Sequence, residues 1–186
     1  MRWDALFGDL DAQWHAAKQL DLETEVNELA RMELSQSTFA EALRGSLGAE
    51  ITAVLCTGVV VHGRIVRVEA QWILLASGPR SFILPLAKVR RISGTGSSLA
   101  PASSTVAYTL AAAMRILCRN RAVVNLDLEG PGTGSVRGVL DRVGADYVQL
   151  ALMTDGATRS RDNHPGTVLL PLGGIVSVAS AADNEF

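Results

Sequence analysis

Basic side chains are the residues of this sequence most able to hold an anionic ligand. They fall into three groups, which are Lys88, Arg90 and Arg91; Arg115, Arg119 and Arg121; and Arg159 with Arg161. Lysine and arginine at such spacing can clasp phosphate oxygens, which positions a nucleic acid without reading its bases. We take the first and third groups as candidate nucleic-acid-binding residues. Solvated charge beside acidic neighbours is the plainer interpretation of each group, and we prefer it.

No other set of residues has the spacing of a catalytic or metal-binding site. The histidines, His15, His62 and His164, are not arranged as HxxxH or HExxH, and the sequence contains no CxxC. We interpret Cys56 and Cys118 as small buried hydrophobic residues and not as nucleophiles. The carboxylates are scattered and form no recognisable pair. We therefore expect no enzyme, no metal site and no cofactor.

An apolar stripe near the N-terminus is the candidate surface for a protein partner. Its members recur at three- and four-residue spacing, as on one side of a helix, and are Trp3, Leu6, Phe7, Leu10 and Trp14. Aromatic-rich surfaces of this kind dominate the energetics of protein interfaces, so the stripe predicts binding of a protein partner or a second copy. Packing against the rest of the same chain is an equally good interpretation.

Downstream, two stretches of the chain predict the same succession of elements. In the first, Thr38 and Glu41 form a capping box, and a short helix should run to about Leu47, where Gly48 ends it. The strands that follow are expected at 51–56, 59–68, 71–76, 81–85 and 89–92. A small, polar stretch over 93–105 has the composition of a linker. Beyond it, a helix from Val106 to about Cys118 precedes strands near 122–128, 136–143, 147–153, 167–171 and 175–179.

These two stretches also match residue by residue. Residues 63–75 align with 138–150, residues 83–92 align with 169–178, and residues 42–44 align with 113–115. The extra residues of the second stretch fall at 130–134 and 154–166, where loops tolerate insertion. The sequence therefore predicts an internal duplication. The expected parts are an N-terminal amphipathic helical segment over 1–37, a first unit over 38–95, a linker over 96–105, a second unit over 106–180 and a tail over 181–186.

If the two units are copies, their cores should use corresponding positions. The expected core pairs are Ile65 with Leu140, Val68 with Val143, Leu75 with Leu150, and Leu84 with Leu170. Aromatic residues also correspond, because Trp72 aligns with Tyr147, and we interpret both as core residues. Arg67 and Arg142 recur in the same way, and we expect them to serve the structure more than a ligand.

A helix followed by five short, bent antiparallel strands resembles the Sm and Sm-like fold, a small SH3-type barrel. Residues 63–75 resemble the first Sm motif, with Gly63 at the bend of the second strand, and residues 89–94 resemble the second motif. The resemblance covers residues 38–95 and 106–180, and it implies two tandem five-stranded barrels. The opening residues, Met-Arg-Trp-Asp-Ala-Leu-Phe, are also similar to those of actinobacterial proteins of unassigned function.

The residues by which Sm proteins hold RNA are replaced in both units. In that family an Asp and an Asn near the end of the first motif help to form the RNA pocket. The matching positions hold Glu69 and Ile73 in the first unit, and Gly144 and Val148 in the second. The resemblance therefore implies the fold more strongly than it implies RNA binding.

Composition and charge narrow the class of protein further. Of the 186 residues, 48% are hydrophobic and 19% are charged, which is enough apolar material to bury a core. The net charge of -2 supplies no overall field that would attract nucleic acid or anionic lipid. Apolar runs fall short of the roughly 20 residues that a membrane span needs. The acidic start lacks the pattern of a secretory signal, so we expect a cytoplasmic protein without membrane contact.

We therefore predict a mainly β protein with some α, in which an N-terminal helical segment precedes two tandem helix-plus-five-stranded Sm-like barrels. Its predicted function is that of a non-catalytic cytoplasmic interaction or scaffold module, which binds a protein partner or self-associates. The alternative is an Sm-like RNA- or DNA-binding regulator.

Overall fold

The computed structural model describes residues 18–19, 27–28, 31–32, 34–101, 108–153 and 166–180 of the chain. The chain divides into two units, Met1–Thr38 and Phe39–Phe186, which are described separately. In the first unit, residues 18–19, 27–28, 31–32 and 34–36 are helical, as the sequence predicts. The apolar stripe of Trp3, Leu6, Phe7, Leu10 and Trp14 lies outside the described residues, so its packing stays a prediction.

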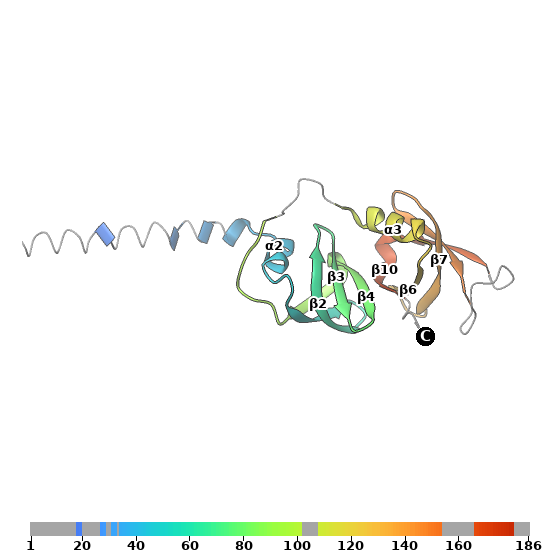
Figure 1. Cartoon of the computed structure of the whole chain (residues 1–186), viewed down its shortest axis with the longest axis horizontal. Coiled ribbons are helices and arrows are strands. Elements are labelled where there is room, and N and C mark those ends of the chain that lie inside the picture. Colours follow the sequence, from blue (N-terminus) through green and yellow to red (C-terminus); the bar gives the residue numbers. More distant parts are fainter. Residues whose placement is uncertain are drawn as a thin grey trace, which may run out of the picture. The chain divides into compact units, whose positions relative to one another are not determined.

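The second unit is mainly β (Figure 1). Its described strands, ten in number, form one antiparallel sheet. Its N-terminal half, residues 39–101, contains α2 (Phe39–Arg44), β1 (Glu50–Leu55), β2 (Val60–Val68), β3 (Trp72–Ser77), β4 (Arg80–Pro85), the 3-10 turn η1 (Leu86–Lys88) and β5 (Val89–Ser93). Its C-terminal half, residues 108–180, contains α3 (Leu110–Arg119), β6 (Val123–Leu128), β7 (Ser135–Val143), β8 (Tyr147–Leu152), β9 (Thr167–Pro171), the 3-10 turn η2 (Leu172–Gly174) and β10 (Ile175–Ser180).

All ten predicted strands are confirmed to within about two residues, whereas both helices differ at one end. The strands could be predicted because β-branched residues alternate with polar ones in the sequence. In β2, for example, buried and exposed side chains alternate along the strand. Helix α3 begins at Leu110 and not at Val106, because the side chain of Thr109 caps it by accepting a hydrogen bond from the Ala112 amide at 3.2 Å. Helix α2 ends at Arg44, and turns continue to Gly48, which has a φ of 82°.

The strand registers of the two halves correspond. The order is β5-β1-β2-β3-β4 in the N-terminal half and β10-β6-β7-β8-β9 in the C-terminal half. A bulge interrupts β2 between Ile65 and Arg67, and another interrupts β7 at the aligned positions. Only glycine fits at positions 63 and 138, because the neighbouring strand is close. A Cβ added to Gly63 would lie 2.6 Å from a carbonyl oxygen of that strand, and a Cβ added to Gly138 would lie 2.1 Å from one.

Each half has its own hydrophobic core, and the expected core pairs lie in these two clusters. Ile65, Leu75 and Leu84 are buried in the N-terminal core, together with Val68. Leu140 and Leu150 are buried in the C-terminal core, and Val143 and Leu170 pack half-buried against it. The side chains that the sequence predicts to face the core therefore do so.

The sheet itself differs from the expected pair of separate five-stranded barrels. Strand β4 pairs with β10, so the ten described strands form a single open sheet across both halves. Among the described strands, none of the pairings closes either half on itself. The sequence could not predict this because the β4–β10 pairing joins residues far apart in the chain.

The first part of the expected linker belongs to the N-terminal half. The Gly96 amide donates a hydrogen bond to the Ser46 hydroxyl oxygen at 3.0 Å, and the Ala100 amide donates to the Glu41 carbonyl oxygen at 3.1 Å. Gly45 permits this contact, because an added Cβ would lie 1.8 Å from the Ser98 carbonyl oxygen. Residues 96–100 therefore lie along α2. Among the described residues, no helix has both the length and the apolar character needed to cross a membrane.

Candidate interaction surfaces

A seam joins the two halves of the second unit, and its backbone part is the pairing of β4 with β10. Val178 lies opposite Ile83, and Ala179 lies opposite Phe82, in antiparallel register. The amide of Ser81 also donates a hydrogen bond to the hydroxyl oxygen of Ser180 at 2.9 Å. The edge that β4 would otherwise present to solvent is thereby covered, which removes a row of unpaired backbone groups.

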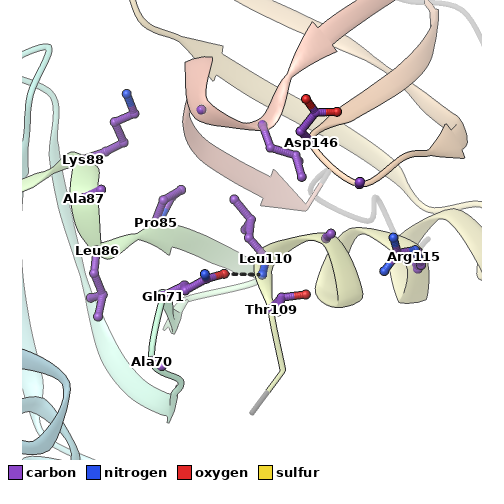
Figure 2. Close-up of a pocket in the computed structure, with 14 residues that line it drawn as sticks. Ala70, Gln71, Pro85, Leu86, Ala87, Lys88, Thr109, Leu110, Arg115 and Asp146 are labelled. Carbon is purple, nitrogen blue, oxygen red and sulfur yellow. Dashed lines mark hydrogen bonds between the residues drawn. The ribbon is translucent and has the colours of Figure 1, made fainter.

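Trp72 anchors the side-chain part of the seam. It lies at the start of β3 in the N-terminal half, yet it is 5% exposed and belongs to the C-terminal core. Its indole Nε1 donates a hydrogen bond to the Tyr108 carbonyl oxygen at 2.9 Å. Beside it, the Leu110 amide donates to the side-chain oxygen of Gln71 at 3.2 Å (Figure 2). Trp72 is thus a core residue, as predicted, but of the opposite half.

Apolar side chains cross the seam in both directions. Leu74 and Ile83 of the N-terminal half pack against the C-terminal core. In return, Val176 of β10 is fully buried within the N-terminal core. Each half thus completes part of the other's core, which explains why the two halves form one compact unit.

Three polar residues, Arg67, Glu69 and Tyr108, interact at the exposed side of the seam. The Nε of Arg67 donates a hydrogen bond to a carboxylate oxygen of Glu69 at 2.7 Å, and its guanidinium carbon lies 4.8 Å from the centre of the Tyr108 ring. The other carboxylate oxygen of Glu69 accepts from the Tyr108 amide at 3.3 Å. Arg67 therefore contacts residues of both halves, Glu69 and Tyr108.

A hollow of about 820 Å³ lies along this seam. Its lining is mostly apolar, with Lys88 and Arg115 as the cationic groups (Figure 2). The two cations stand well apart in Figure 2 and do not converge on one point. Arg115 also donates a hydrogen bond to the Gly144 carbonyl oxygen at 2.9 Å. This arrangement does not favour a site for a single anion.

Of the candidate nucleic-acid-binding residues, Lys88, Arg90 and Arg91 lie in the described part of the chain, and their contacts differ. Lys88 forms an ion pair with Glu129, and its hydrogen bond and charge hold the pKa of the Glu129 carboxyl below its ordinary value. Arg90 and Arg91 are exposed on β5. The other two candidates, Arg159 and Arg161, lie outside the described residues. The structure therefore leaves a smaller free basic surface around Lys88 than the sequence suggests.

The residues considered for catalysis and metal binding are also dispersed. His62 is exposed, and its ring lies 2.9 Å from the Thr52 hydroxyl, while His15 and His164 lie outside the described residues. Cys56 and Cys118 are unpaired and half-buried, and each packs against the core of its own half. Within the described part of the chain, no three His, Cys, Asp or Glu side chains gather as metal ligands would.

At the far end of the sheet, the positions that build the seam are repeated but uncovered. Tyr147 occupies the place of Trp72 and is 41% exposed, and Leu169 occupies the place of Ile83 and is 66% exposed. The interpretation of Tyr147 as a core residue is therefore wrong. A hollow of about 290 Å³ lies beside these residues and is lined by Asp146, Tyr147, Leu169, Leu170 and Pro171. We call this the β9 surface.

Sequence reasoning missed the β9 surface, although a signal for it is present. Leu169 aligns with Ile83, so the repeat predicts an apolar residue on the outer strand of each half. No protein-family model matches the chain, and no curated protein matches its sequence.

Proposed function

We propose that this chain is a non-catalytic interaction module built from two Sm-like repeats, and that it binds protein through the β9 surface. The corresponding sheet orders, bulges and core positions of the two halves support the repeat interpretation. The proposal includes a cytoplasmic location, with which the two unpaired cysteines agree.

The main observation that supports the proposal is that the side chains of Ile83 and Leu169 differ in their exposure. Both are apolar residues on the outer strand of a five-stranded half, but Ile83 is half-buried in the seam whereas Leu169 is 66% exposed. Strand β9 pairs only with β8 among the described strands, so its outer backbone groups are also open. An uncharged edge strand with an exposed leucine is a ready-made site for strand addition by a protein.

The alternative function, nucleic-acid binding, receives less support from the contacts. Phosphate binding needs free cationic groups on one surface, and Lys88 is instead held by Glu129. Trp72, which could otherwise stack on a base, is buried in the C-terminal core. The apolar stripe of residues 3–14 stays a second proposed contact for a protein partner.

The experiment compares Leu169→Glu with Val60→Glu in the full chain. Val60 is 49% exposed on β2, far from β9 in the sheet order, so it is a matched control for adding a charge to an exposed apolar strand position. Protein binding, measured as self-association and as recovery of bound proteins on the immobilised chain, should be lost with Leu169→Glu and kept with Val60→Glu. Equal binding by the two variants would refute the proposal.

Nucleic-acid binding is tested on the same samples with mixed RNA at two salt concentrations. Affinity for RNA that falls steeply as salt rises, together with unchanged protein binding by Leu169→Glu, would establish the alternative instead.

A further inference from the structure

The turn between β2 and β3 and the turn between β7 and β8 are closed by the same backbone hydrogen bond. The Glu69 amide donates to the Trp72 carbonyl oxygen at 2.9 Å, and the Gly144 amide donates to the Tyr147 carbonyl oxygen at 2.8 Å. Glu69 aligns with Gly144, and Trp72 aligns with Tyr147. The two turns therefore correspond in their backbone, and they differ in their side chains.

In the C-terminal half, the ring of Tyr147 lies over the glycine of its own turn. A Cβ added to Gly144 would lie 2.3 Å from Cε1 and 2.6 Å from Cδ1 of the Tyr147 ring, so the ring occupies the space that a larger residue would need. The Gly144 carbonyl oxygen also accepts a hydrogen bond from Arg115 of α3 at 2.9 Å, which ties the turn to the helix. Gly144 thus gives the ring a resting place on a turn that is itself held.

In the N-terminal half, a glutamate side chain takes this place. The carboxylate of Glu69 accepts hydrogen bonds from Arg67 and from the Tyr108 amide. Because Glu69 has a Cβ, Trp72 cannot lie over the turn as Tyr147 does. Trp72 instead reaches across the seam into the C-terminal core, where it is 5% exposed.

We propose that Tyr147 is a movable anchor of the β9 surface. Its ring rests on Gly144 while this surface is free, and it turns outward when a strand of a partner protein is added to β9. The outward ring takes the place that Trp72 has at the seam. This inference rests on the proposed function and describes how binding at that surface is regulated.

The surroundings of Tyr147 leave room for this movement. The ring is 41% exposed, so it is not enclosed by other side chains. It also forms one wall of the hollow of about 290 Å³ beside Leu169. Rotation about the Cα–Cβ bond of an exposed side chain is fast compared with protein association. The movement therefore changes how tightly a partner binds without slowing its arrival.

The resting place lowers the affinity of the β9 surface. A bound partner uses only the outward ring, so the apparent affinity falls with the fraction of molecules whose ring is outward. A strand with apolar side chains offsets this loss, because it covers the ring. At the seam, Ile175 and Val178 of β10 belong to the same buried cluster as Trp72. The movable ring therefore favours an apolar strand over a polar one.

Gly144→Ala tests the resting place. The φ of Gly144 lies outside the left-handed region, so alanine is compatible with the turn. The nearest atoms that the new Cβ would meet belong to the Tyr147 ring, so the ring and not the backbone should move. Gly173→Ala is the matched control, because a Cβ added there meets nothing within 4 Å.

Fluorine NMR of the full chain labelled with fluorotyrosine reports the position of the ring. The sequence has two tyrosines, so Tyr108→Phe assigns both signals. The Tyr147 signal should move in Gly144→Ala and stay in place in Gly173→Ala. A Tyr108 signal at its parent position shows that each variant keeps the fold. A Tyr147 signal that Gly144→Ala does not move overturns the inference.

Binding is measured on the same labelled chains with a synthetic peptide of residues 172–180, because it contains β10, the strand that covers β4 in the seam. The peptide should move the parent's Tyr147 signal toward its position in Gly144→Ala. Gly144→Ala should bind the peptide at least about threefold more tightly than the parent, since its ring is already outward, and Gly173→Ala should bind it as the parent does. Equal affinities of the parent and Gly144→Ala overturn the inference, as does binding that leaves the Tyr147 signal unmoved.

A control peptide tests the preference for an apolar strand. It carries threonine in place of Ile175 and Val178, which keeps a β-branched strand but removes apolar surface. This peptide should bind the parent more weakly than the original peptide does. Equal binding of the two peptides by the parent would show that they do not cover the ring and would overturn the inference.

The failures of this inference and of the proposed function are distinguishable. Peptide binding that Leu169→Glu does not weaken overturns the β9 surface as the binding site, and with it the proposed function. Binding that requires Leu169 but is unaffected by Gly144→Ala overturns the movable ring alone. A peptide that binds neither the parent nor Gly144→Ala also overturns the movable ring, and the recovery of proteins by Leu169→Glu then decides the proposed function.

Discussion

The strongest prediction concerns Trp72 and Tyr147, which occupy aligned positions in different surroundings. Trp72→Ala should lower the free energy of unfolding by about 3–5 kcal/mol, the range for removing a buried aromatic side chain. The structure supports the full range, because the ring is 5% exposed in the C-terminal core and its Nε1 donates a hydrogen bond to Tyr108 at 2.9 Å. Removing the ring therefore opens a cavity at the seam and leaves the Tyr108 carbonyl oxygen without this donor.

Tyr147→Ala should cost less, because Tyr147 is 41% exposed. Full burial of a large apolar side chain contributes about 1.5–3 kcal/mol, so the covered part of this ring contributes about 1–2 kcal/mol. An intermediate variant, Trp72→Phe, keeps most of the apolar ring but removes the N–H donor, and it should cost about 0.5–1.5 kcal/mol for the hydrogen bond plus a packing loss.

Urea unfolding followed by far-ultraviolet circular dichroism measures these differences without using tryptophan fluorescence as the probe. Low protein concentration is used, because self-association would stabilise the folded state. The slope against urea should be the same in all variants, so that midpoints compare directly. Equal losses for Trp72→Ala and Tyr147→Ala, or a loss below about 1 kcal/mol for Trp72→Ala, would refute the assignment of Trp72 to the seam.

Three further perturbations test other parts of the fold. Leu75→Ala should lower the free energy of unfolding by about 2–5 kcal/mol, since Leu75 is fully buried, and an unchanged urea midpoint would contradict the assigned core. Gly138→Ala should lower the free energy of unfolding by about 1–3 kcal/mol, because the new Cβ would lie 2.1 Å from a carbonyl oxygen. Gly173 has open space around it, so Gly173→Ala should change the free energy of unfolding by no more than about 0.5 kcal/mol in the same urea measurement. Lys88→Met should raise the pKa of Glu129 toward its ordinary value in a carbon-detected NMR titration. The lowered pKa stabilises the fold only at a pH where Glu129 is ionised. The free energies of unfolding of parent and variant should therefore converge as pH falls through the pKa of Glu129 in the parent. A pKa of Glu129 that is the same in both proteins would exclude the ion pair.

Much of the fold could be predicted from the sequence, because local physical chemistry decides it. Alternation of β-branched and polar residues predicted ten strands, and the structure has them at the predicted places. Alignment of residues 63–75 with 138–150 predicted the paired core positions, since side chains that point to the same face of corresponding strands bury together. Gly63 and Gly138 were visible as shared residues, and the close approach of the neighbouring strand explains them.

The tertiary structure alone decided how the halves combine and which positions are left open. Trp72 and Tyr147 align, yet one is buried and the other exposed, because burial depends on what lies across the seam and not on the residue's own repeat. The pairing of β4 with β10 is set by contacts between residues about a hundred positions apart, which no local pattern records. In the same way, Lys88 belongs to a basic group in the sequence but forms an ion pair in space, because Glu129 reaches it from the other half. The exposure of the β9 surface has the same cause, since among the described residues Leu169 lacks the neighbouring strand that covers the aligned Ile83.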